Sequence, residues 1–246
     1  DRFAALAADR GIVADRIAAG DVAQCEPALA RSSRFRAAYL VPDECQIRNP
    51  RHLQALRIAC ARRGVEITPM AEVHDFRIRA DRIQSVQTAR GPISAEQVCL
   101  TAGAWSAVVC RRLGLARHLG AIAALAAYFA LSLENVLSVK PIRGQIVLFN
   151  AQRPILSRIV NEGSRYLVPR GDGRLLAGST EEDAGFDRST TAGGVQELLN
   201  FAIGLVPELA SAPIERTWAG LRPTTADGFT YLGRLPGLEN GLIAAG

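Results

Sequence analysis

Apolar positions in the first half of the chain recur with two spacings, and each spacing predicts a different element. Leu53 and Leu56 follow at helical spacing after Asn49-Pro50, a favourable helix start. A helix is therefore predicted over residues 50–63, ended by Gly64. Short apolar or alternating runs predict strands over residues 65–68, 73–79, 82–88 and 97–100, and then a helix reaching residue 113.

The second half has a denser pattern of short extended segments. Strands are predicted over residues 142–149, 155–160, 165–168 and 174–177, with a turn at 170–173 between the last two. A helix is predicted over 192–205, then a strand ending near residue 222, and residues 241–246 carry an apolar strand pattern. A helix leading into a buried strand is typical of an α/β unit, whereas consecutive strands favour an antiparallel sheet.

Composition narrows the class of protein. The 246 residues are 48% hydrophobic, enough for a packed core, and the net charge is +5. The basic residues are spread without a block of like charges, which argues against nucleic-acid binding. Five cysteines form no C-x-x-C pair and three histidines have no ligand-like partner, so neither a disulfide framework nor a metal site is expected. No secretory pattern opens the chain, and a cytoplasmic location is the expectation.

Residues 119–133 form a run of fifteen uncharged, mainly apolar positions. This is shorter than the ~20 residues that a membrane-spanning helix requires. The main interpretation is a packed helix, and the alternative is a helix that lies on a membrane surface or binds a partner.

Arg222 is the leading candidate for binding an anion. Trp218, Gly220 and Arg222 alternate along a predicted strand and so share one face, and Pro223 favours an extended backbone before the turn. A planar ligand could approach over Gly220 while the guanidinium grips a carboxylate. The alternative is a solvated arginine or a structural ion pair.

Small residues after the strand at 97–100 are a second candidate site. Residues 101–106, Thr-Ala-Gly-Ala-Trp-Ser, lead directly into a helix. Such a junction lets a phosphate or a ring come near the backbone. Tight packing of the helix on the strand is an equally good explanation of this motif alone.

Several motifs in fixed order together resemble the D-amino-acid oxidase superfamily of flavoproteins, and most closely its glycine oxidase branch. They are Pro-Asp-Glu-Cys-Gln-Ile-Arg-Asn-Pro at 42–50, Ala-Gly-Ala-Trp-Ser at 102–106, Pro-Ile-Arg-Gly-Gln at 141–145, Tyr-Leu-Val-Pro-Arg at 166–170 and Trp-Ala-Gly-Leu-Arg-Pro-Thr-Thr-Ala-Asp-Gly at 218–228. Each motif is weak alone, but their order and spacing cover nearly the whole chain.

The resemblance implies a fold of α/β plus α+β class, in which an incomplete, Rossmann-like FAD-binding domain is interleaved with an antiparallel-sheet substrate domain. Residues 1–48 and 139–225 would belong to the substrate domain. Residues 49–115, lacking the first βαβ unit, and 226–246 would belong to the FAD domain. Residues 116–138 would be an apolar, helical insertion.

The resemblance also implies roles for individual residues. Arg222 and Tyr166 would bind the substrate carboxylate, although Tyr166 packed on the sheet is the alternative. Residues near FAD would be Pro69, Met70, Val73, Ala102, Gly103, Trp105 and Gly220. No protein base is required, and no metal is expected.

The implied activity is FAD-dependent oxidation of glycine or a similarly small amino acid to an oxo acid, ammonia and hydrogen peroxide, with a link to thiazole and thiamine synthesis. Oxygen or another acceptor would reoxidise the flavin, and a homo-oligomer and membrane contact are left open. One alternative is a D-amino-acid dehydrogenase or a sarcosine-oxidase-like enzyme. An alternative of another class is a truncated remnant that binds an amino acid without catalysis.

The chain departs from the family pattern in three places. It contains no G-x-G-x-x-G after a strand, and the family's stretch with a second substrate arginine does not follow Gly246. The resemblance also implies that the interval from Leu115 to Pro141 is about twenty residues longer than in typical glycine oxidases. Both ends therefore look cut, and this chain is expected to bind FAD weakly or not at all.

Overall fold

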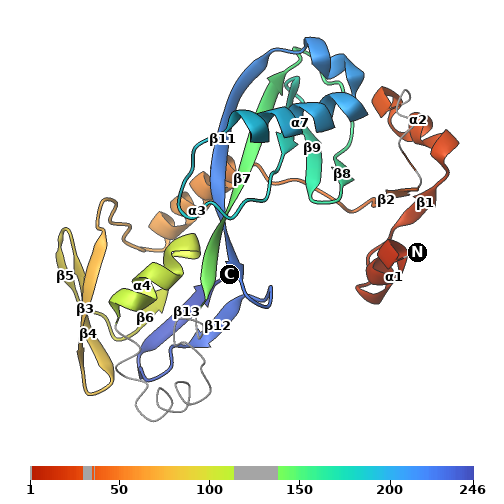
Figure 1. Ribbon diagram of the computed structural model, residues 1–246. Helices are drawn as coiled ribbons and strands as arrows, with labels where there is room; N and C mark the ends of the chain where they lie inside the picture. The colour runs from red at the N-terminus through yellow and green to blue at the C-terminus, as the bar shows by residue number, and fades with distance from the viewer. Residues whose placement is uncertain (1, 30–34, 36, 114–137) are drawn as a thin grey trace. The chain divides into compact units, whose positions relative to one another are not determined.

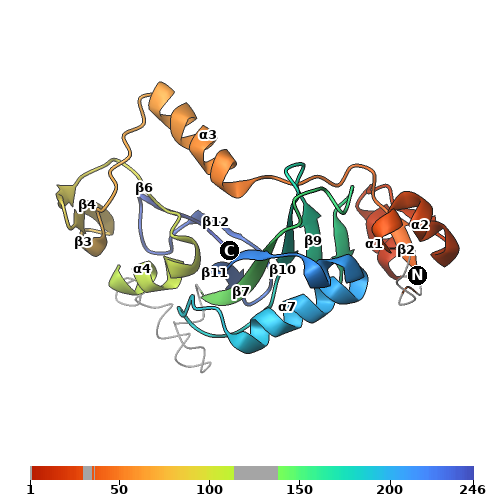
Figure 2. The same ribbon diagram turned by 90° about the horizontal axis from the view of Figure 1, so that it is seen from above.

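The computed structural model describes residues 2–29, 35, 37–113 and 138–246, and these fall into two compact units (Figures 1 and 2). One unit contains residues 1–56, 144–181 and 188–220, and the other contains 57–143, 182–187 and 221–246. The predicted domain boundaries at 48/49 and 225/226 stay predictions. The assignment of the units to substrate and FAD domains stays a prediction.

A five-stranded sheet is the centre of the first unit. Its strand order is β11-β7-β10-β9-β8, with bounds β7 Val139–Asn150, β8 Val160–Glu162, β9 Arg165–Pro169, β10 Arg174–Gly178 and β11 Ile214–Thr225. Neighbours β7, β10, β9 and β8 pair antiparallel, so the sequence prediction of an antiparallel sheet is confirmed. Strands β7 and β11 also run on into the residues of the second unit.

Helix α7 (Ala192–Leu205) covers one face of this sheet, as both ribbon views show (Figures 1 and 2). Val147, Phe149, Leu167 and Leu175 form a single core with the buried side of the helix. Side chains alternate across a strand. Tyr166 and Val168 therefore lie on the opposite face, which we call the open face of the sheet.

The N-terminal segment of the first unit forms small elements that are separate from this sheet. They are α1 (Arg2–Asp9), β1 (Asp15–Ile17), α2 (Val22–Cys25) and β2 (Ala38–Leu40), and β1 pairs with β2. The buried carboxylate of Glu26 accepts hydrogen bonds from the backbone and hydroxyl of Ser157 and from the backbone of Arg158. These bonds attach the segment to the loop before β8.

The second unit has a separate core between two three-stranded sheets and helix α4 (Ser106–Arg112). Strands β3 (Val73–Arg79), β4 (Arg82–Thr88) and β5 (Gly91–Ile93) form one sheet, and β12 (Tyr231–Arg234), β13 (Gly241–Ala245) and β6 (Val98–Leu100) form the other. β13 pairs parallel with β6. The side-chain amide of Asn240 accepts from the backbone N–H of Ile83 (2.9 Å) and donates to its carbonyl (3.0 Å), which joins the two sheets.

The helix prediction for residues 50–63 is confirmed by α3 (Asn49–Arg62), and the helix at 192–205 by α7. The strand predicted at 65–68 is wrong, because Val65 and Ile67 are exposed and the segment has no strand structure. The strand predicted at 155–160 is also wrong, since only Val160 enters β8 and Leu156 is buried in the core without strand pairing.

The predicted insertion at 116–138, including the apolar run at 119–133, lies outside the described residues except for Ser138. Within the described part of the chain, no helix combines the length and the apolar character needed to cross a bilayer.

Candidate functional site

Strand β11 presents an open position before its arginine. Gly220 is exposed, and within the described residues no neighbouring atom would lie within 4 Å of a Cβ added to it. Trp218, two residues earlier, is half-buried beneath the guanidinium of Arg216, whose carbon lies 4.8 Å from the ring centroid. Arg222 is exposed two residues after Gly220. The alternation therefore leaves room for a ligand over the strand next to the guanidinium.

The turn after β11 is stabilised by the side chain of Asp227, which lies within it. Asp227 accepts a hydrogen bond from the backbone N–H of Phe229 (3.0 Å), and Gly228 has φ +78°, which a glycine adopts without strain. The hydrogen bond from Phe229 lowers the pKa of Asp227. The carboxylate is therefore held in its charged form.

Tyr166 lies on the open face of the sheet, opposite Gly178 of the neighbouring strand. A Cβ added to Gly178 would lie 2.7 Å from the ring and hydroxyl atoms of Tyr166. The ring therefore lies against the backbone of Gly178. Tyr166 is thus packed on the sheet, and it remains half-buried. Its role in binding the substrate carboxylate stays a prediction.

The junction between β6 and α4 (Ser106–Arg112) also has an open backbone. Gly103 has φ +54°, and no described atom lies within 4 Å of its Cβ position. Its conformation, and not tight packing, accounts for the glycine. Trp105 is 43% exposed, and its ring centroid lies 5.7 Å from that of Phe186.

Ser106 carries an unexplained polar atom at this junction. The residue is fully buried, and its hydroxyl has no hydrogen-bond partner among the described residues. Buried hydroxyl groups normally have a partner, because an unpaired one costs free energy. The open Gly103, the half-exposed Ala102 and the unpaired hydroxyl fit a junction that receives part of a bulky polar cofactor.

The other predicted cofactor residues belong to the loop before β3. Met70 has φ +58° and is 85% exposed, while Val73 begins β3. The guanidinium of Arg112 donates to the carbonyl of Val73 and lies 3.5 Å from the carboxylate of Glu72. The Val73 carbonyl therefore already has a donor within the protein. Pro69 precedes Met70 in the same turn.

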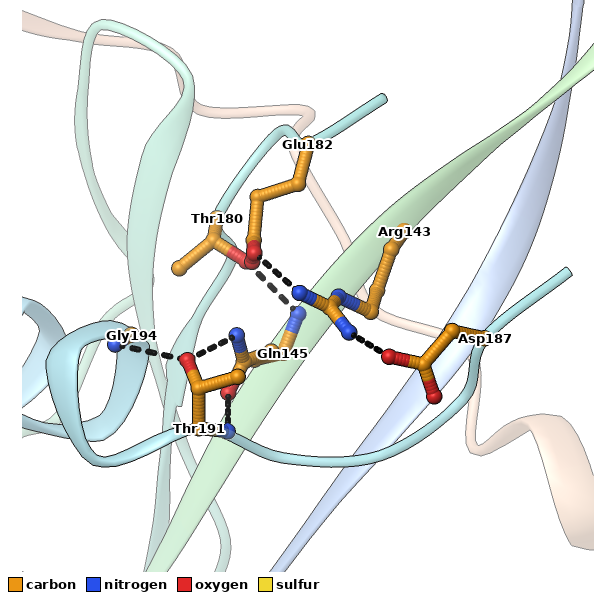
Figure 3. Close-up of polar contacts among 7 residues, drawn as sticks. All are labelled: Arg143, Gln145, Thr180, Glu182, Asp187, Thr191 and Gly194. Carbon is orange, nitrogen blue, oxygen red and sulfur yellow. Dashed lines mark hydrogen bonds and ion pairs between the residues drawn. The ribbon is translucent and has the colours of Figure 1, made fainter. Parts of the chain in front are cut away.

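Gln145, a member of the motif at 141–145, organises the start of α7 (Figure 3). Its fully buried amide accepts from the backbone N–H of Thr191 (2.8 Å) and donates to the Thr191 hydroxyl (3.1 Å). That hydroxyl in turn caps the helix by accepting from the N–H of Gly194 (3.1 Å). A Cβ added to Gly194 would clash with the Gln145 amide, so a larger residue there would displace the amide from Thr191.

Arg143 of the same motif holds the segment at 182–187 (Figure 3). Its nearly buried guanidinium pairs with Glu182 (2.6 Å) and Asp187, and its backbone forms a two-way bridge with Glu182. The hydrogen bond to Glu182 raises the pKa of Arg143. Sequence reasoning did not assign these roles to Arg143 and Gln145, because the partners lie about 40 residues away in sequence.

A buried thiol, Cys110, occurs on α4. Burial raises its pKa from 9.0 to about 11, against a smaller opposing effect of Arg111. No group of three metal-ligating side chains that could hold a metal ion occurs in the described parts of the chain.

The chain is similar to known glycine oxidases. It is 35% identical over 222 residues to the glycine oxidase of Pseudomonas putida, covering 86% of this chain and 55% of that protein. It is also 35% identical to the glycine oxidase of Geobacillus kaustophilus over 92% of this chain. The crystal structure of a G. kaustophilus glycine oxidase matches all of this chain and 60% of its own length, with 32% identity and a TM-score of 0.82.

The chain thus spans little more than half the length of these relatives. The structural match confirms the predicted fold class, a mixed α/β fold with antiparallel sheets. The family model described as "DAO: FAD dependent oxidoreductase" matches residues 1–246. This chain therefore belongs to the DAO family of FAD-dependent oxidoreductases.

Proposed function

We propose that this chain forms the substrate-binding part, and some of the FAD-binding part, of an amino-acid oxidase that acts on glycine or a similarly small amine. The observation that carries the proposal is the exposed Arg222, which follows the unobstructed backbone of Gly220 on β11. Similarity to glycine oxidases supports the choice of substrate.

Arg222 would bind the substrate carboxylate through two parallel hydrogen bonds, the geometry for which a guanidinium is suited. The hydroxyl of Tyr166 would add a donor, and Gly178 would keep its ring in place. Holding a small amino acid in one orientation can contribute on the order of 7 to 11 kcal/mol to catalysis. No protein base is needed if the amine is bound in its neutral form.

The residues that would hold FAD are Ala102, Gly103 and Trp105 at the β6–α4 junction, with Pro69, Met70 and Val73 before β3 and Gly220 on β11. When bound, FAD supplies the two-electron oxidation of the amine. The printed sequence has no G-x-G-x-x-G turn for the pyrophosphate. The proposal therefore assigns only part of a complete cofactor site to this chain.

The products would be an oxo acid, ammonia and, with oxygen as acceptor, hydrogen peroxide. A place in thiazole synthesis and a cytoplasmic location belong to the same proposal. Because the missing glycine-rich turn also fits a protein that only binds an amino acid, a non-catalytic binding module is the second candidate.

Calorimetric titration of glycine tests the proposed substrate site. Glycine should bind the unmodified chain, and R222A should weaken binding by about tenfold or more, as expected for losing charged hydrogen bonds. R90A, which removes an exposed arginine from the β4–β5 turn, is the matched control and should bind normally. Equal glycine affinity of R222A and the unmodified chain would remove Arg222 from the site.

Peroxide formation distinguishes the two candidate functions. With excess FAD, an oxidase should produce hydrogen peroxide from glycine at a rate that R222A lowers. A binding module should give a heat with glycine but no peroxide at any FAD concentration.

A further inference from the structure

Four arginines gather at one end of the five-stranded sheet, and we call this region the arginine end: Arg48, Arg170, Arg174 and Arg216. All four belong to the first unit. Arg170 and Arg174 flank the turn between β9 and β10, where the N–H of Arg170 donates to the carbonyl of Arg174 (2.8 Å). The turn keeps these two residues adjacent.

The other two arginines are brought there by separate segments. The side chain of Gln46 donates to the carbonyl of Pro169 (2.8 Å), which places the stretch of chain before Arg48 at the end of β9. At the start of β11, the carbonyl of Pro213 accepts a hydrogen bond (2.9 Å) from the backbone N–H of Asn150, which is the β7 residue that pairs with Arg174. Arg216 follows on β11 and lies over Trp218.

The carboxylates at this end are taken by one arginine. Arg174 donates to Glu215 (2.7 Å) and to Asp172 (3.1 Å), so it has two acidic partners. In the described structure, Arg48, Arg170 and Arg216 form no ion pair within 4.0 Å with any carboxylate. Counted together, the four guanidinium groups and these two carboxylates carry a net charge of +2.

The lowered pKa of Arg170 agrees with an excess of positive charge at the arginine end. Burial lowers the pKa of its half-buried guanidinium, and the charge of Arg48 lowers it further, followed by smaller effects of Arg216 and Arg174. The charge of Asp172 opposes these neighbours and raises the pKa of Arg170. Like charges held together cost free energy, which an anion bound between them would offset.

We propose that the arginine end is a binding site for a small oxyanion with two negative charges, such as phosphate or a dicarboxylate. A dianion matches the uncompensated charge, and the planar guanidinium groups can each donate two hydrogen bonds to its oxygens. The site is built from the first unit alone and does not involve Arg222. It thus shares no guanidinium group with the proposed amino-acid site.

Calorimetric titration at constant ionic strength and neutral pH tests this site, with inorganic phosphate in one arm and malonate in the other. Saturable binding of either anion, with no comparable effect of chloride, is the expected result. The arm that binds more tightly identifies the source of the oxyanion. R170Q and R216Q should each weaken binding by about tenfold, the loss expected for a charged hydrogen bond.

Two controls keep the outcome unambiguous. R90Q removes an exposed arginine elsewhere and should not change anion affinity, and R222A should lose glycine binding while retaining the anion. Thermal unfolding in chloride checks that the variants fold; R216Q serves if R170Q does not, because Arg216 is exposed. Absence of saturable binding, equal affinity of R216Q and the unmodified chain, or loss of the anion in R222A would each overturn the proposal.

Discussion

Gly178 determines where the Tyr166 side chain can lie. A Cβ at residue 178 would be 2.7 Å from the tyrosine ring, so any larger residue there must push the ring away from the sheet. G178A should therefore destabilise the protein by about 1 to 3 kcal/mol through overpacking. Urea unfolding measures this loss.

The matched control is G171A in the adjoining turn, where an added Cβ meets no described atom within 4 Å. Its stability should change by less than about 1 kcal/mol. If Tyr166 also donates to the substrate, G178A should weaken glycine binding while G171A should not. Unchanged stability and affinity in G178A would contradict the position of the ring.

Cysteine reactivity should separate the thiols by their surroundings. Cys45 and Cys99 are exposed, whereas Cys110 is buried with a pKa of about 11. At pH 8, iodoacetamide should modify Cys45 and Cys99 first and leave the Cys110 thiol unreacted in the folded protein. Mass spectrometry of peptides after timed labelling measures the order, and early labelling of Cys110 would contradict its burial.

The same thiol has a defined effect on alkaline stability. Its pKa is higher in the folded state than the ordinary value of 9.0, so its contribution to stability is complete below about pH 9. The free energy of unfolding should fall as pH rises from 9 towards 11. C110A should show a smaller fall over this interval, measured by urea unfolding at each pH.

At the level of elements, helices α3 and α7 have equal length but different roles in stability. α3 has no buried residue, and Leu53 and Leu56 are 61% and 49% exposed, whereas Leu198 of α7 is fully buried. The double variant L53Q/L56Q should lose less than about 1 kcal/mol of unfolding free energy. L198A should lose about 2 to 5 kcal/mol, because it leaves a cavity. Urea unfolding of both variants makes the comparison, and similar losses would contradict it.

The start of α7 depends on a pair of residues from distant segments. T191A should cost about 0.5 to 2 kcal/mol, the usual range for loss of an N-cap. Q145A removes the amide that binds the backbone and hydroxyl of Thr191, so the two substitutions should couple by about 0.5 kcal/mol or more. A double-mutant cycle by urea unfolding measures the coupling, and strictly additive losses would show that the two residues act separately.

The spacing of apolar residues predicts an element correctly where those residues are buried in a core. The helix at α7 and strands β7, β9 and β10 agree with prediction because their alternating or helical apolar residues do face a core. Val65 and Ile67 carry the same β propensity but have no strand partner in the described structure. Propensity alone does not form a strand without such pairing.

The candidate site was predictable only where the residues of a motif adjoin in sequence. The alternation of Trp218, Gly220 and Arg222 could be inferred from one strand. The contact of Tyr166 with Gly178 and the gathering of the arginine end depend on register between strands, which a single segment does not define. Sequence reasoning therefore found the guanidinium of β11 but not the surroundings of the other side chains.

At the scale of the whole molecule, two separate cores support two units, and only one of them carries the proposed FAD junction. With no glycine-rich turn in the printed sequence, FAD should bind weakly and be lost on desalting. Absorbance at 450 nm after desalting in the presence and absence of added FAD measures retention. Recovery of a yellow protein with one FAD per chain would falsify this prediction.

The amide of Asn240 has a consequence for how the second unit opens. It offers one donor and one acceptor to Ile83, as a neighbouring strand would, although the two residues are 157 positions apart. The Ile83 amide proton is therefore shielded by a side chain from a distant part of the chain. Its exchange with deuterium should accelerate whenever the segment before β13 detaches, so one backbone proton reports on the contact between the two sheets of this unit.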